Sequence, residues 1–293
     1  MSAPEREAIT AEERSAPESD RPSRRQRWFG GRALSDGSHI YWWREILIVG
    51  VLNIVYETVR NISSAKPSKA YENALRLIDW QKALGIWHEL AIQQWALGWT
   101  PLIVFANYFY GSVYILATVG GLVFLYRRFP DDYPLHRNML AVTTMLGLIG
   151  FATFPLMPPR LLDDTILLDG LNIGRFFGFV DTLVDYPTFW SFNDEAMKAI
   201  SNQFAAMPSL HCAWAFWGAA VFFPRVRSWW AKALALGYPA MTIFVVVITG
   251  NHYFLDAVGG LAVFGVGVLL SRRFTRAGRR APVGQARSAI ATS

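Results

Sequence analysis

Cysteine is almost absent from this chain, because Cys212 is the single one among 293 residues. A disulfide framework within the chain and a cysteine-based zinc cluster are therefore excluded. Charged residues are also scarce: they make up 17% of the sequence, whereas apolar residues reach 53%. An ordinary soluble domain carries about 25% charged residues, so this balance favours a membrane protein.

The two ends of the chain differ from its middle. The first 38 residues contain no short apolar run followed by a small-residue cleavage site, so we expect no cleaved signal peptide. They are rich in Glu, Ser, Pro and Arg, which is typical of disorder. We therefore predict a disordered basic leader over residues 1–38, a single six-helix transmembrane catalytic domain over 39–272, and a disordered basic tail over 273–293.

Long apolar stretches recur between these ends. A helix needs about 17 to 25 apolar residues to cross a hydrocarbon layer of ~30 Å. Six stretches approach that length, and the predicted fold class is therefore all-α, a polytopic membrane protein with six transmembrane helices. The fourth stretch is short and suffices only if its helix begins a few residues earlier. The predicted spans are Ile40–Asn61, Leu102–Tyr126, Met139–Met157, Ser209–Phe223, Trp229–Gly250 and His252–Ser271.

The basic residues predict the orientation. Most of the 28 Lys and Arg lie in the leader, the tail and the connections after the second and fourth spans. Six spans place these four segments on one side, and loops rich in Lys and Arg stay in the cytoplasm. Both termini are thus expected to be cytoplasmic. The same residues contact anionic headgroups, so the net charge of +6 does not require nucleic acid as a partner.

Two segments on the outer side are not predicted to span. Pro67–Leu97 mixes apolar and charged residues and carries Trp80, Trp87 and Trp95, which is typical of an amphipathic helix on the membrane surface. The stretch 158–207 is rich in acidic and aromatic residues, and a connection of that length is usually functional or a lid.

The residues that indicate chemistry lie at the starts of the fourth and sixth spans, both on the predicted outer side. Asp256 follows His252 by four residues, and side chains at that spacing share one helix face. A carboxylate bonded to one ring nitrogen fixes the tautomer and leaves the other nitrogen free to attack. His211 can protonate a departing oxygen. Ser209 and the free N–H groups at that helix start suit a phosphate oxygen.

A lone histidine at a membrane interface is more often a packing residue than a catalytic group. Two histidines and an aspartate on one predicted side favour function, because an ionisable group within a span is costly. Asn251 directly precedes His252 and is also predicted to bind substrate.

These residues resemble the motifs of the type 2 phosphatidic acid phosphatase (PAP2) superfamily. Pro208-Ser-Leu-His211 matches its second motif, and His252-Tyr-Phe-Leu-Asp256 matches the end of its third. The resemblance also includes the six predicted spans and therefore covers about residues 40–271.

The resemblance implies specific roles. His252 is expected to form a phosphohistidine intermediate, Asp256 to orient it, and His211 to act as general acid and then as base. Ser209 is expected to hold a phosphate oxygen. No metal and no other cofactor is expected.

The chain also departs from the superfamily pattern. The third motif normally begins with Ser-Arg, where this chain has Val245 and Val246, and the first motif is absent. The pattern His-Tyr-any-any-Asp is more similar to the branch that includes inositol phosphorylceramide synthases, in which an alcohol can resolve the phosphohistidine.

Another cation must then stabilise the charge that spreads over the phosphate oxygens. Arg160 is our first candidate, because it follows the third span at its outer end, where two prolines stop the helix. Arg60, at the outer end of the first span, is the second candidate. An arginine at this position can instead extend its side chain so that the charge lies at the membrane interface, with no role in the site.

The sequence therefore predicts an integral membrane lipid-phosphate phosphatase whose active site faces outward, with lipid phosphates and membrane lipids as partners. Transfer of a phosphate or phospho-head group to an alcohol, such as a polyol, is the alternative. A carrier that moves lipid phosphates without chemistry is a lesser alternative, and it would predict broken helices and internal repeats. The sequence shows neither.

Overall fold

The computed structural model describes residues 31–62, 66–163, 176–186, 188 and 204–280. It has two compact units, Met1–Val51 and Leu52–Ser293. In the first unit, strand β1 (Arg32–Ala33) pairs antiparallel with β2 (His39–Ile40). The prediction of an all-α chain therefore missed a short hairpin, which closes through a turn with Gly37 at φ 81°. The prediction of disorder is wrong for residues 32–38, which form β1 and the turn of the hairpin, and for 273–280, which belong to a helix that ends at Arg280. Residues 1–30 and 281–293 are outside the described residues, so disorder there stays a prediction.

Helices occupy all six positions predicted as spans. They are α3 (Trp42–Ile62), which begins in the first unit and ends in the second, and α6 (Thr100–Arg128), α7 (Tyr133–Thr153), α10 (Leu210–Phe222), α11 (Trp229–Ile248) and α12 (Phe254–Arg280).

Three of these helices are long and apolar enough to cross a membrane: α6, α11 and α12, the last over Phe254–Thr275. Helix α10 is apolar but shorter. The chain is therefore a multi-pass membrane protein, while six spans stay a prediction. Helix α7 has the required length, but its first turns carry the polar residues His136, Arg137 and Asn138.

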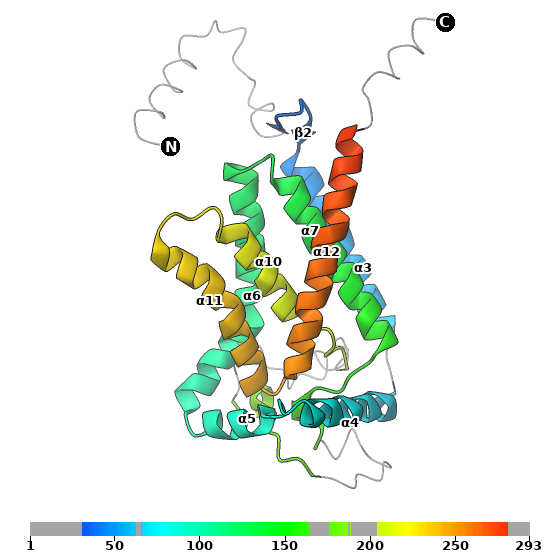
Figure 1. Cartoon of the computed structure of the whole chain (residues 1–293), viewed down its shortest axis with the longest axis vertical. Coiled ribbons are helices and arrows are strands. Elements are labelled where there is room, and N and C mark those ends of the chain that lie inside the picture. The colour runs from blue at the N-terminus through cyan, green and yellow to red at the C-terminus, as the bar shows by residue number, and fades with distance from the viewer. Residues whose placement is uncertain (1–30, 63–65, 164–175, 187, 189–203, 281–293) are drawn as a thin grey trace, which may run out of the picture. The chain divides into compact units, whose positions relative to one another are not determined.

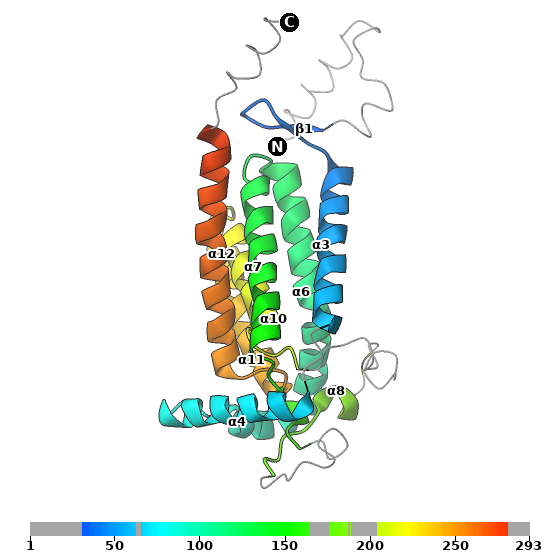
Figure 2. The ribbon, with the colours of Figure 1, turned by 90° about the vertical axis from the view of Figure 1, so that its right-hand side faces the viewer.

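Helix α10 is the centre of the second unit. It packs against α6, α7, α11 and α12 (Figures 1 and 2), and most of its residues are buried. A helix that is apolar all round belongs in such a position. Its 13 residues span only about 20 Å. The helix does not begin before Ser209, as the length of a full span would require, because Ser209 is its N-cap.

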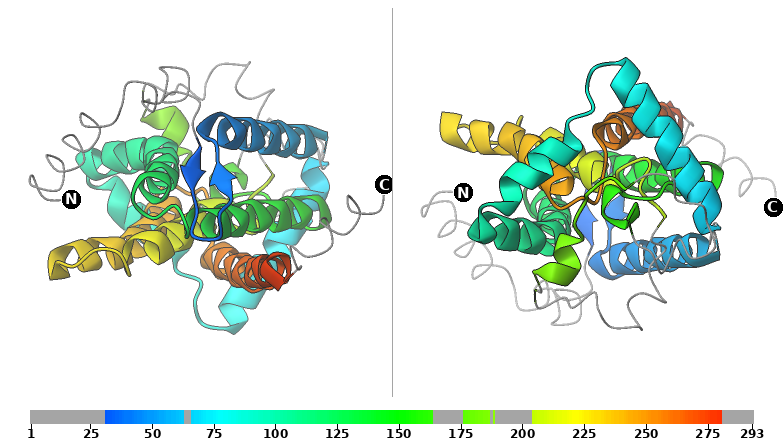
Figure 3. Two further views of the ribbon diagram at one scale, coloured as in Figure 1. Left: turned by 90° about the horizontal axis from the view of Figure 1, so that it is seen from above. Right: turned by 90° about the horizontal axis from the view of Figure 1, so that it is seen from below.

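The segment Pro67–Leu97, predicted as one amphipathic helix, is two. Helix α4 (Pro67–Ala83) and helix α5 (Glu89–Leu97) are separated by a turn at Gly85, whose φ of 70° suits glycine. Both lie across the ends of the longer helices, as the view from below in Figure 3 shows.

The apolar side of α4 is buried by protein rather than by lipid. Its buried residues pack against Leu156, Met157 and Tyr253, and Asn73 Nδ2 donates to Pro155 O at 2.8 Å. The residues of α4 in this core are Ala70, Ala74, Leu77 and Ile78. Trp80 stays half-exposed. Helix α4 is thus part of the wall behind the residues that open α12.

The start of α12 touches the start of α10 at a glycine. A Cβ atom on Gly260 would lie 2.5 Å from Ser209 O and 3.2 Å from Ala213 N, both backbone atoms. Gly259 is nearly as close, since its Cβ would lie 3.2 Å from Pro208 Cβ. By contrast, a Cβ on Gly265 would meet no atom within 4 Å. Gly259 and Gly260 thus permit a close approach of α12 to the start of α10 that a side chain would block.

We expect Gly260→Ala to lower the free energy of unfolding by about 1–3 kcal/mol, because the new methyl group can be accommodated only by moving backbone. Thermal unfolding in one detergent would measure the loss. Gly265→Ala is the matched control and should unfold at or above the wild-type temperature. Equal melting of the two variants would contradict the close contact.

Candidate active site

His252 lies in the short connection between α11 and α12. Helix α11 ends at Ile248, and Gly250 turns the chain with φ 68°. A side chain at position 250 would also collide with Gln93 Nε2, at 2.8 Å from its Cβ. The His252 N–H donates to Val246 O at 3.1 Å, so the turn is bonded back onto α11. The imidazole is thus attached to a constrained turn and not to a helical residue.

Asp256 contacts His252 by capping its own helix. His252 Nδ1 and Asp256 Oδ2 are 3.2 Å apart, and the same oxygen accepts from Tyr253 N at 2.9 Å. Tyr253 directly precedes α12, so a side chain three residues later that reaches back to its N–H makes half of a capping box. The sequence predicted this pair from helical spacing. The pairing occurs, but His252 precedes α12 by two residues and the capping geometry brings the side chains together.

His211 faces the same space from α10. The ring centroids of His211 and His252 are 5.9 Å apart. Two tyrosines of α6 hold the His211 ring: Tyr110 is stacked on it at 4.4 Å, and Tyr114 meets it edge-on at 4.6 Å. The two histidines, 41 positions apart in the chain, are therefore close enough to act on one group.

Ser209 connects the two helix starts. Its hydroxyl accepts from Cys212 N at 3.4 Å and so caps α10, while its N–H donates to Asp256 O at 2.9 Å. The side chain is fully buried. A serine hydroxyl that accepts one bond can still donate its hydrogen. Among the described residues, none accepts from the N–H groups of Leu210 and His211.

Arg160 is held beside this turn by three contacts. It lies in the one-turn helix η2 (Pro159–Leu161), after α7 has ended at Thr153. Its N–H donates to Gly250 O at 2.8 Å, and its Nε donates to Asn251 Oδ1 at 3.0 Å. Its Nη1 forms an ion pair with Asp181, with the two side chains 15% and 18% exposed. Among the described residues, side chains engage two of its five N–H donors, at Nε and Nη1.

Asn251 is hydrogen-bonded to this arginine. Its Oδ1 accepts from Arg160, and its Nδ2 donates to Thr249 Oγ1 at 2.8 Å. It was predicted to bind substrate, and that role stays a proposal. Its observed contacts align Arg160 next to His252.

Arg60, the other predicted clamp, lies on α3, but its side chain is outside the described part of the chain. Its role stays a prediction.

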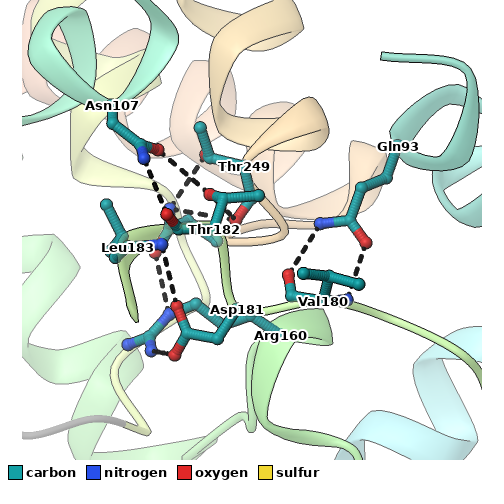
Figure 4. Close-up of polar contacts among 9 residues, drawn as sticks. Gln93, Asn107, Arg160, Val180, Asp181, Thr182, Leu183 and Thr249 are labelled. Carbon is teal, nitrogen blue, oxygen red and sulfur yellow. Dashed lines mark hydrogen bonds and ion pairs between the residues drawn. The ribbon is translucent and has the colours of Figure 1, made fainter. Parts of the chain in front are cut away.

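The segment 176–186 covers Arg160 and is anchored from several elements. Asp163 accepts from the N–H groups of residues 177, 178 and 179, and Gln93 exchanges two hydrogen bonds with Val180. Figure 4 shows Asp181 facing Arg160 while its other oxygen accepts from Leu183 N at 3.1 Å, which caps helix α8 (Thr182–Asp185). This part of the predicted loop is therefore a fixed cover.

Asn107 of α6 fastens the end of the cover. Its Nδ2 donates to Thr182 O at 2.8 Å and to Tyr186 O at 3.1 Å, and its Oδ1 accepts from Thr182 Oγ1 at 3.0 Å. Thr182 Oγ1 also lies 3.3 Å from Thr249 O, as Figure 4 shows. The cover and the turn that carries His252 are thus connected.

A family model described as the PAP2 superfamily matches residues 75–270, which is more than half of the 293 residues. The chain belongs to the PAP2 superfamily. No curated protein and no solved structure matches it. Members of the PAP2 superfamily are generally phosphatases. The matched range includes His211, His252, Asp256 and Arg160, whereas Arg60 lies outside it.

The sequence interpretation missed several residues that build this PAP2 site. Asn107, Tyr110 and Tyr114 have helical spacing on one face of an otherwise apolar span, a pattern that singles out a polar face within the bundle. Asp181 is one of many acidic residues in the stretch 158–207, and no sequence pattern near it connects it with Arg160. Among the described residues, no three His, Cys, Asp or Glu side chains gather as metal ligands would. The expectation that no metal takes part stays a prediction.

We expect Asn107→Leu to loosen the cover, because Thr182 and Tyr186 would lose buried hydrogen bonds. The Tyr186 amide should exchange about tenfold faster in detergent, which corresponds to a decrease of ~1.4 kcal/mol in the free energy of local opening. Ser112→Ala, also on α6, removes a hydroxyl that donates to Tyr108 O of its own helix and should leave Tyr186 unchanged. Unchanged exchange in Asn107→Leu would contradict the anchoring.

Proposed function

We propose that this chain is an integral membrane phosphatase that cleaves lipid phosphate esters through a phosphohistidine at His252. The observation that supports this most strongly is the pairing of His252 with Asp256 at 3.2 Å, opposite His211 at 5.9 Å between ring centroids. A nucleophile, its orienting carboxylate and a second imidazole are the groups that this chemistry needs.

The reaction divides into two steps. The His252 ring nitrogen remote from Asp256 attacks phosphorus, and His211 protonates the departing lipid alcohol. His211 then takes a proton from water, which attacks the phosphohistidine and releases phosphate. Asp256 keeps the attacking nitrogen unprotonated by accepting from Nδ1, and it stabilises the charge that develops on the ring.

Arg160 is the cation that we assign to the transferred phosphoryl group. Its orientation is set before substrate arrives, because Asn251 and Asp181 each hold one edge of the guanidinium. Donors that need no rearrangement stabilise developing charge most effectively. The N–H groups of Leu210 and His211 at the start of α10, which have no acceptor in the part of the chain that the structure describes, supply further donors for phosphate oxygens together with the Ser209 hydroxyl.

The charge distribution supports an outward-facing site. The site lies where α10 and α12 begin and α11 ends, whereas Arg128, Arg137 and Arg225 lie at the other ends of α6, α7 and α10. Basic residues favour the cytoplasmic side. We therefore propose that the substrate is a lipid of the extracytoplasmic leaflet and that both termini are cytoplasmic.

Transfer to an alcohol is the second candidate, and the burial of the nucleophile favours it. His252 is 5% exposed, and the covering segment 176–186 is fixed over the neighbouring Arg160. Bulk water has limited access to such a histidine, so a bound polyol can compete for the phosphoryl group. This is the chemistry of the inositol phosphorylceramide synthase branch, which we propose as the alternative assignment of the chain.

Phosphate trapping tests the assignment of roles. Purified protein is incubated with lipid phosphates that carry labelled phosphorus and is then quenched in base, which preserves phosphohistidine. We expect His252→Ala to abolish both labelling and turnover, and His211→Ala to slow turnover by 10²-fold or more while retaining some label, as for a lost general acid–base group. His136→Gln, changed at the start of α7, is the control and should label normally.

Near-normal turnover in His252→Ala would refute the role of His252, and lipid transport without turnover in the wild type would favour a carrier.

The acceptor is identified by adding inositol or another polyol to the same assay. If water is the acceptor, the rate of phosphate release is unchanged and no phosphorylated polyol appears. If an alcohol is the acceptor, the phosphorylated polyol accumulates and turnover without polyol is at least tenfold slower. Either product pattern requires His252, so the two candidates are separated without altering the protein.

A further inference from the structure

The first turn of α12 is bonded by side chains from distant parts of the chain. The N–H groups that open a helix have no partners within it and must be satisfied from elsewhere. Tyr253 N donates to Asp256, as described above. Phe254 N donates to Glu89 Oε1 at 2.9 Å, and Leu255 N donates to Gln81 Oε1 at 3.1 Å. The two acceptors precede their donors by 165 and 174 positions.

Both acceptors are fully buried. Gln81 near the end of α4 and Glu89 at the start of α5 are each 0% exposed. The second oxygen of Glu89 accepts from His88 N at 3.1 Å, so the carboxylate is held at both oxygens. Trp87 lies between them in sequence and contacts the ring of Tyr253, at 6.2 Å between centroids. The turn from α4 to α5 therefore wraps around residues 253–255.

Burial of the Glu89 carboxylate at this place is unfavourable in free energy. Burial raises the pKa of Glu89, and the hydrogen bond from Phe254 N opposes that shift. The start of a helix is one of the few places where such a group is favoured, because the positive end of the helix dipole faces it.

The two acceptors bond N–H groups that lie between His252 and Asp256 in the chain. Asp256 Oδ2 is shared between His252 Nδ1 and Tyr253 N, so its orientation requires that Tyr253 and the first turn of α12 keep their conformation. Loss of either acceptor would leave a buried N–H unpaired and let this turn fray. The direction of the attacking nitrogen would then be less well defined, whereas Arg160, which is held by Gly250, Asn251 and Asp181, would stay in place.

We propose that Gln81 and Glu89 are positioning residues that fix the first turn of α12 and thereby hold the His252–Asp256 pair in its reactive geometry. This inference rests on the proposed function for its kinetic consequence, but its structural content can be measured without turnover. It gives the α4–α5 turn a function in the reaction although the turn supplies no reacting group.

The test combines kinetics with amide hydrogen exchange on full-length protein in detergent. Gln81→Met keeps the size of the side chain without an acceptor, and Glu89→Ala removes the carboxylate. In each variant we expect kcat to fall at least tenfold with KM within about twofold, and the amides of residues 253–255 to exchange at least tenfold faster, because alignment is lost and binding is kept. Glu89→Gln, which retains Oε1 for Phe254, should recover most of kcat.

Two variants on the same helices are matched controls. Gln94→Met on α5 removes a hydrogen bond to Gly178 O, and Glu72→Ala on α4 removes a surface ion pair with Lys69. Both should leave kcat and the exchange of residues 253–255 as in the wild type. Glu89→Asp keeps the charge but shortens the reach, and it replaces Glu89→Ala if that variant fails to fold.

The outcomes separate this inference from the proposed function. Wild-type exchange at residues 253–255 in both Gln81→Met and Glu89→Ala or Glu89→Asp would overturn the positioning role. A rise in KM at constant kcat would overturn it as well, since that result indicates substrate binding. If the wild type cleaves no phosphate ester, the proposed function fails, while faster exchange in the variants would still establish that these residues hold the turn.

Discussion

The geometry of this site depends on how the N–H groups at two helix starts are satisfied. At α12, Asp256 turns back to bond Tyr253 and in doing so meets His252, and at α10 the N-cap Ser209 donates its own N–H to the carbonyl of Asp256. The two starts are thus bonded to each other, and Gly260 permits the approach because any side chain there would strike the backbone of Ser209. The spacing of His211 and His252 is a consequence of this contact.

The side chains that we assign to the chemistry are held by residues to which the proposed reaction gives no chemical step. Tyr110 and Tyr114 of α6 hold the His211 ring, and Asn251 and Asp181 hold Arg160. Asn107 in turn fastens the segment to which Asp181 belongs. Such support keeps the groups aligned before substrate binds, which lowers the energy that the substrate must spend on ordering them. The same contacts keep these side chains largely buried, with His252 only 5% exposed.

Much of the fold could be predicted because apolar runs have a simple length requirement. The predicted positions of the helices agree with the observed ones, and the motif residues around His211 and His252 pointed to the PAP2 superfamily, which the family match confirms. The errors have local causes. Gly85 breaks a helix that a run of mixed residues suggested was continuous, and β1 and β2 form a hairpin from residues too few to show an alternating pattern. Asp181, Gln81 and Glu89 could not be assigned because their partners are far away in the sequence.

The sequence by itself determined the membrane class, the positions of the helices, the superfamily and the identity of the two histidines and the aspartate. It could do so because hydrophobic length and motif spacing are properties of contiguous residues. Only the tertiary structure decided that α10 is central, that Arg160 is oriented by Asn251 and Asp181, and that Gln81 and Glu89 bond the start of α12. These features arise from hydrogen bonds and close packing between segments distant in the chain, and such contacts exist only once the helices have assembled.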